Sequence, residues 1–132
     1  MVRVDGHCII APDYIRRCVD YLEREPIVGV GGPMETVGET PTARTIALAM
    51  SSLFGVGNSA FRVHVNSHRY VDTIPFPAYR MSTLREAGPF DEDLIRNQDD
   101  EYNYRLRSMG GKLLLAPDVR SKYYSRSSLK AL

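Results

Sequence analysis

Short apolar segments alternate with amphipathic segments of helical period along the chain, and no other sequence feature limits the possible folds as strongly. The clearest pair is the helical pattern at residues 12–24 and the apolar run at 27–32, which ends in glycines. The predicted strands are 1–5, 8–11, 27–32, 71–76, 112–116 and 119–124, and the predicted helices are 12–24, 42–54, 81–87 and 98–109. This alternation is typical of an α/β sandwich with a mostly parallel sheet, in which ligands bind beyond the carboxyl ends of the strands.

The composition is that of one globular domain without a strongly charged face. The chain has 132 residues, of which 43% are hydrophobic and 25% charged, and its net charge is +1. This balance offers no basic surface for nucleic acid. The apolar stretch at 46–54 is interrupted by serines and is too short to span a bilayer. Because no signal peptide is visible, we interpret Cys8 and Cys18 as reduced thiols of a cytoplasmic protein.

The first candidate site is Asp5-Gly6-His7, directly after the strand predicted at 1–5. In an extended segment alternate side chains point the same way, so Asp5 and His7 would face one ligand. A carboxylate and an imidazole suit Mn²⁺ or a related divalent cation, with phosphate oxygens completing its coordination. The alternative is an ordinary turn, because Asp-Gly is a common turn dipeptide.

The second candidate site is the run of acids Asp99, Asp100 and Glu101 at the start of the helix predicted at 98–109. A carboxylate that faces a cleft can act as a general base. The helix dipole alone also favours acids at this end, by about 0.3–1 kcal/mol per group, and Glu101 can pair with Arg105 one turn later. The sequence leaves both interpretations open. We expect Asp99 to face the cleft more than Glu101 does, and Asn97 to cap the helix.

Taken in order, these motifs resemble family 2 glycosyltransferases of the GT-A fold, in particular the bacterial polysaccharide enzymes of the succinoglycan-biosynthesis type. The resemblance covers essentially the whole chain but only the second part of the family's catalytic domain. Residues 5–7 match its Asp-x-Asp metal motif, 31–33 the following strand, 57–62 the loop near donor and acceptor, 76–80 a strand entering a short helix, 88–92 a turn, and 98–106 the base segment. Here His7 replaces the last aspartate of the metal motif, and Gln98 replaces a frequent glutamate.

The resemblance implies transfer, with inversion, from a nucleotide-diphosphate sugar to a saccharide or lipid-linked acceptor in bacterial polysaccharide synthesis. It implies a divalent cation, Mn or Mg, bound by Asp5 and His7. It makes Asp99 the catalytic base, with Asp100 as the second candidate. By the same matching, the candidate substrate contacts are Asn58, Arg62, Arg80 and Arg105. For Arg80 and Arg105, a surface ion pair is the more common role of an arginine in such a position.

In the family, the first strands of the sheet and most nucleoside contacts precede the metal motif. We therefore expect residues 1–132 to form an incomplete Rossmann-like GT-A sandwich that is inactive alone and binds nucleotide sugar weakly. The strand at 1–5 would expose an unpaired edge and promote homo-oligomers. Association with the cytoplasmic face of a membrane would depend on parts outside this chain. A non-catalytic binding module of the same fold, and a metal-dependent phosphohydrolase that uses Asp5, His7 and Asp99, remain alternatives.

Overall fold

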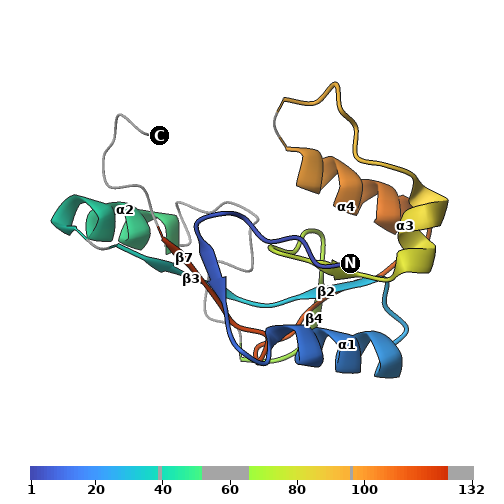
Figure 1. The fold of residues 1–132 in the computed structure, drawn as a ribbon, viewed down its shortest axis with the longest axis horizontal. Helices are drawn as coiled ribbons and strands as arrows, with labels where there is room; N and C mark the ends of the chain where they lie inside the picture. The colour runs from blue at the N-terminus through green and yellow to red at the C-terminus, as the bar shows by residue number, and fades with distance from the viewer. Residues whose placement is uncertain (39, 52–65, 96, 125–132) are drawn as a thin grey trace.

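The computed structural model describes residues 1–38, 40–51, 66–95 and 97–124, and these form a mixed α/β structure (Figure 1). The helices are α1 (Tyr14–Arg24), α2 (Pro41–Ser51), α3 (Met81–Ala87) and α4 (Gln98–Ser108). The strands are β1 (Cys8–Ile10), β2 (Gly29–Gly31), β3 (Met34–Val37), β4 (Arg69–Val71), β5 (Ala78–Tyr79), β6 (Leu113–Leu115) and β7 (Ser121–Tyr124). The predicted α/β class is confirmed. None of the described helices is long and apolar enough to cross a bilayer.

The described strands form two mixed sheets. The four-stranded sheet has the order β4-β6-β2-β5, in which β2 and β6 are parallel and the two outer pairings are antiparallel. The three-stranded sheet has the order β1-β7-β3, with β3 parallel and β1 antiparallel to β7. The prediction of a mostly parallel sheet is met only in part, because β2–β6 and β3–β7 are parallel and the other three described pairings are antiparallel. Strand direction depends on how the chain connects, not on apolar periodicity.

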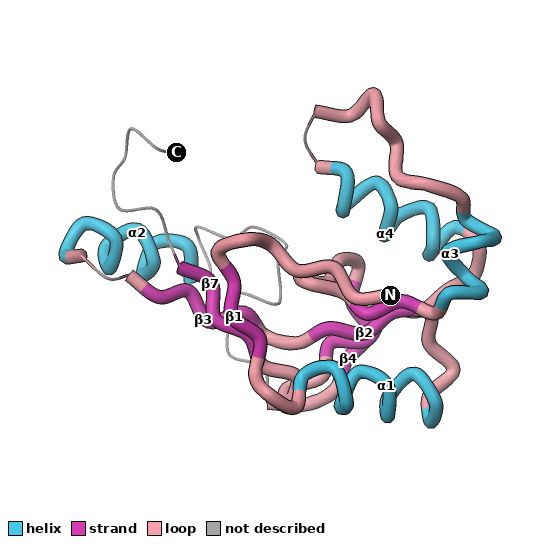
Figure 2. The backbone as a smooth tube through the Cα atoms, in the orientation of Figure 1, coloured by secondary structure: helices cyan, strands magenta, loops and turns pink. Residues whose placement is uncertain are grey.

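The four-stranded sheet is covered on both faces, as Figure 2 shows for α1 on one side and α3 with α4 on the other. In strand β6, side chains that alternate between the two faces of the sheet pack into the two cores on either side. Leu114 packs into the core that contains Tyr14 and Cys18 of α1, whereas Leu113 and Leu115 pack into the core under α4. A strand buried on both faces reads as a continuous apolar run, which is what its three leucines are.

The segment 1–5 is not a regular strand. Val2 forms an isolated bridge with Ala78, the Arg3 N–H donates to the Pro77 carbonyl at 3.1 Å, and the Tyr79 N–H donates to the Met1 carbonyl at 2.8 Å. The start of the chain therefore lies along the outer side of β5 and extends the edge of the four-stranded sheet.

Further local predictions were wrong. The strand predicted at 71–76 is not formed, because β4 runs from Arg69 to Val71 and ends there. Strand β3 lies where a loop was expected between 33 and 41, and its partner β7 is far away in sequence. Asn97 is the N-cap residue of α4, as predicted, but its side chain makes no capping hydrogen bond. Its backbone is left-handed, with φ 61°, and its carbonyl accepts the Glu101 N–H at 3.1 Å. The predicted end of α4 is confirmed, because Gly110 has φ 88° and its N–H bonds to the Arg107 carbonyl at 2.9 Å.

Candidate functional site

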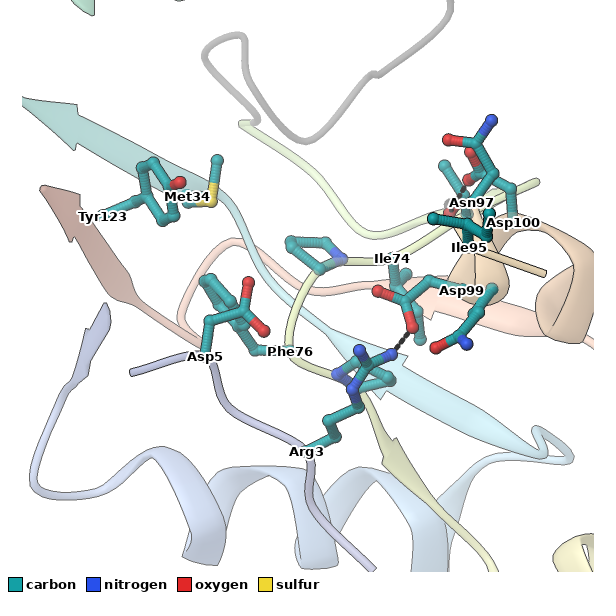
Figure 3. A pocket seen from close by; sticks show the side chains of 14 residues that line it. Arg3, Asp5, Met34, Ile74, Phe76, Ile95, Asn97, Asp99, Asp100 and Tyr123 are labelled. Carbon is teal, nitrogen blue, oxygen red and sulfur yellow. Dashed lines mark hydrogen bonds and ion pairs between the residues drawn. The ribbon is translucent and has the colours of Figure 1, made fainter. Parts of the chain in front are cut away.

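A cavity of about 380 Å³ opens where the start of the chain, the loop before β5 and the start of α4 meet (Figure 3). Most of its lining comes from three segments, residues 3–5, residues 73–77 and residues 97–100. The lining residues are Arg3, Asp5, Met34, Thr73, Ile74, Pro75, Phe76, Pro77, Ile95, Asn97, Gln98, Asp99, Asp100 and Tyr123. Both predicted sites, at the start of the chain and at the start of α4, therefore contribute to one pocket.

Asp5 lines this pocket, but His7 is not among the lining residues. The chain turns after Asp5, whose carbonyl accepts the Cys8 N–H at 3.1 Å. The His7 ring packs instead against Tyr123, with ring centroids 5.4 Å apart. The expectation that both side chains face the same cleft assumed an extended backbone, and the turn at Gly6 separates them.

The acidic start of α4 divides between the pocket and the helix surface. Asp99 and Asp100 line the pocket, whereas Glu101 does not. Glu101 accepts two hydrogen bonds from Arg105, from Nε at 2.9 Å and from Nη2 at 2.7 Å. The predicted orientation of Asp99 relative to Glu101, and the pairing of Glu101 with Arg105, are confirmed.

The two pocket carboxylates of α4 have different partners. Asp99 forms an ion pair with Arg3, which comes from the start of the chain. Asp100 accepts a hydrogen bond from the Thr73 hydroxyl at 3.0 Å. Figure 3 shows the carboxylates of Asp5 and Asp99 on different segments of the pocket wall, with the guanidinium of Arg3 beside Asp99.

Behind Asp100 lies a hydrogen-bond chain that sequence reasoning missed. The Tyr79 hydroxyl donates to Asn103 Oδ1 at 2.7 Å, and Asn103 Nδ2 donates to Thr73 Oγ1 at 2.9 Å. Asn103 is fully buried, and both ends of its amide are satisfied. With Asn103 as its donor, the Thr73 hydroxyl directs its own proton to Asp100.

Arg3 was also missed, although a signal for it existed. It stands two residues before Asp5, so the alternation argument applied to Asp5 also places Arg3 on the same side of an extended segment.

Two of the predicted substrate contacts, Arg80 and Arg105, do not line this pocket. Arg80 donates from Nε to the Ile27 carbonyl at 2.9 Å. Arg105 binds Glu101 and the carbonyls of Ala87 and Pro89, and so fastens α4 to the end of α3. Neither arginine is among the lining residues. The remaining two predicted contacts, Asn58 and Arg62, lie outside the described residues.

The charge balance of the pocket determines what it can bind. Three carboxylates, of Asp5, Asp99 and Asp100, stand against the single guanidinium of Arg3 among the described lining residues. An anionic diphosphate would be repelled here unless a cation came with it. No group of three or more His, Cys, Asp or Glu side chains within the described ranges could hold a metal ion. One or two carboxylates with substrate phosphates are nevertheless a usual set for Mg²⁺, so the residues present fit such a cation.

Comparison with known proteins places these motifs in context. No protein-family model matches the chain. The chain is 27% identical over 132 residues to the succinoglycan biosynthesis protein ExoA of Rhizobium meliloti (strain 1021). It is 28% identical over 131 residues to the dolichyl N-acetyl-alpha-D-glucosaminyl phosphate 3-beta-D-2,3-diacetamido-2,3-dideoxy-beta-D-glucuronosyltransferase of Methanococcus voltae.

These alignments cover 100% and 95% of the chain but 40% of each relative, so the chain spans about two fifths of their length. The name of one relative states a sugar transfer, and the name of the other states a role in polysaccharide synthesis. The whole-chain similarity confirms the resemblance drawn from the motifs, and the chain fits a partial domain of a family 2 glycosyltransferase.

Proposed function

We propose that the full-length protein transfers a sugar, with inversion, from a nucleotide-diphosphate sugar to a saccharide or lipid-linked acceptor in polysaccharide synthesis. The observation that carries this proposal is the meeting of Asp5 and Asp99 in one pocket, although they are far apart in sequence. Residues 1–132 would supply the side of the site that binds the cation and the acceptor, and would be inactive alone.

The chemistry assigns different work to the two pocket carboxylates. Asp5, which lines the pocket, is the proposed ligand for Mn²⁺ or Mg²⁺. For His7, the second ligand predicted from the sequence, to bind the same cation, its ring would have to leave its contact with Tyr123. When bound, such a cation offsets the negative charge that develops on a leaving diphosphate. Asp99 would take the proton of the acceptor hydroxyl, with Asp100 as the alternative base.

We further propose that the protein works in the cytoplasm or at the cytoplasmic face of a membrane, with any membrane attachment provided by other parts of the protein. Cys8 and Cys18 are free thiols. Burial raises the pKa of Cys8 to about 11 and that of Cys18 to about 12, so both stay protonated near neutral pH. Unpaired, protonated thiols are consistent with a reducing compartment.

A homo-oligomer formed through the sheet edge at residues 1–3 is also part of the proposal. This segment hydrogen-bonds to residues 77–79 on one side, and no further strand pairs with it within the part of the chain that the structure describes. An edge with free backbone groups can recruit a second strand.

The experiment that tests the function targets Asp5. In the full-length protein, Asp5→Asn should weaken Mn²⁺-dependent binding of a nucleotide sugar by about tenfold or more, because an amide is a poorer ligand for a hard cation than a carboxylate. Calorimetric titrations with UDP- and GDP-sugars, with and without Mn²⁺, measure this change. Asp20→Asn is the matched control, since it removes the same charge from α1 and not from the pocket. Unchanged Mn²⁺ dependence in Asp5→Asn would contradict the assignment.

A further inference from the structure

Arg3 lines the pocket and makes three contacts with different parts of the chain. Its backbone N–H donates to the Pro77 carbonyl at 3.1 Å, and its guanidinium forms an ion pair with Asp99. The same guanidinium lies over the Phe90 ring, 5.3 Å from the ring centroid. The Phe90 ring in turn stacks on the Tyr102 ring, with ring centroids 4.2 Å apart. Arg3 therefore has a fixed backbone and an aromatic support, while its charge faces the pocket.

The position of Arg3 relative to Asp5 makes it a neighbour of any diphosphate bound there. Both side chains line the pocket and come from the same short segment (Figure 3). Arg3 is the sole basic side chain among the described lining residues, in a pocket with an excess of two negative charges. A guanidinium presents five N–H donors in a planar fork that matches the oxygens of a phosphate.

The ion pair that Arg3 makes in the free protein can be exchanged. The side chains of Arg3 and Asp99 are 37% and 48% exposed, so water screens part of their attraction, although the pairing nitrogen, Arg3 Nη1, is itself buried. The pair with Asp99 joins one guanidinium nitrogen, Nη1, to one carboxylate oxygen, Oδ1. A diphosphate bound with its cation can accept two charge-assisted hydrogen bonds from the guanidinium, which would draw Arg3 away from Asp99.

We propose that Arg3 exchanges partners, pairing with Asp99 in the free protein and with the diphosphate of the donor once the donor and its cation are bound. This inference rests on the proposed function. The exchange uncovers the carboxylate of Asp99 for the acceptor hydroxyl only when the donor is in place. Arg3 is thus a donor-binding residue that also controls access to the proposed base.

The test uses inorganic diphosphate with Mn²⁺ as the probe, because it contains the group that all such donors share. Calorimetry on the full-length protein should show about tenfold or more weaker binding in Arg3→Met, and a smaller loss in Arg3→Lys, which keeps the charge but not the fork. Asp99→Asn should bind the probe more tightly than the wild type, because Arg3 no longer has to break its ion pair with Asp99 before it binds the diphosphate.

Removing any negative charge from the pocket would favour an anion, so Asp100→Asn is the matched control. Asp100 lines the same pocket but bonds to Thr73. Partner exchange predicts a larger gain for Asp99→Asn than for Asp100→Asn, and equal gains for the two when each is combined with Arg3→Met. Thermal unfolding of each variant checks that it is folded.

The outcomes separate the two proposals. Wild-type affinity in a folded Arg3→Met variant, or equal gains in the two asparagine variants with Arg3 intact, would overturn partner exchange and leave the proposed function standing. If the wild-type protein shows no Mn²⁺-dependent binding of diphosphate, or if Asp5→Asn keeps that binding, the proposed function fails and this inference fails with it.

Discussion

Replacing Asp99 with asparagine in the full-length protein is expected to lower the rate of sugar transfer by about 10²–10⁴-fold, the usual contribution of a general base. The amide has almost the shape of the carboxylate, so the start of α4 keeps its packing, but it cannot accept the proton of the acceptor hydroxyl. The rate is measured in single turnovers with the donor that the binding titrations identify. Donor binding should persist, which separates a loss of chemistry from a loss of the site.

Two neighbours on α4 provide controls for this result. Glu101→Gln should keep most of the activity, because Glu101 pairs with Arg105 outside the pocket. Asp100→Asn removes an equal charge from the pocket and tests the alternative base. A large loss in Asp100→Asn together with near-normal transfer in Asp99→Asn would show that Asp100 is the base, and would contradict the assignment made here.

Gly32→Ala is expected to lower the free energy of unfolding strongly. Gly32 lies between β2 and β3, where the backbone of residues 116–119 crosses close to it. A Cβ at Gly32 would overlap the Val119 carbonyl oxygen and lie 2.8 Å from the Ala116 carbonyl oxygen. Both are backbone atoms, so no side chain can rotate away. The loss in free energy of unfolding should be about 3 kcal/mol or more.

Gly6→Ala is the matched control for this change. A Cβ at Gly6 would meet nothing within 4 Å. Its effect on the free energy of unfolding should stay within about 0.5 kcal/mol, as at an ordinary surface position. Urea unfolding of both variants measures the difference. Equal stabilities would mean that residues 116–119 do not press against Gly32 as the structure has them.

The sequence predicts most helices and strands because their apolar residues recur at helical or strand spacing. Helix α3, for example, occupies the predicted residues 81–87. Pairing and strand direction depend on contacts between distant segments, which spacing does not encode. Strand β3 was missed for this reason, since it is stabilised by its ladder with β7. The turn at Gly6 illustrates the same limit, because Asp-Gly is compatible with both an extended and a turned backbone.

For the site, the sequence predicts the two acidic segments but not their partners. Asp5 and Asp99 line one pocket, as the resemblance of their two motifs to one family's site had predicted. The chain from Tyr79 through Asn103 to Thr73 joins residues 24 and 30 positions apart, and no local pattern marks any of its members. Arg3 could have been found, because its spacing from Asp5 is itself a local pattern.

The most direct test of the central claim is whether the sugar of a nucleotide sugar reaches an acceptor. The full-length protein is incubated with a labelled donor and Mn²⁺ or Mg²⁺, with and without a saccharide or lipid-linked acceptor. Nucleoside diphosphate and labelled product are then quantified together. We expect the two products to form in equal amounts, and only when acceptor and divalent cation are both present. Release of free sugar or inorganic phosphate at the same rate without acceptor would contradict it and identify a hydrolase.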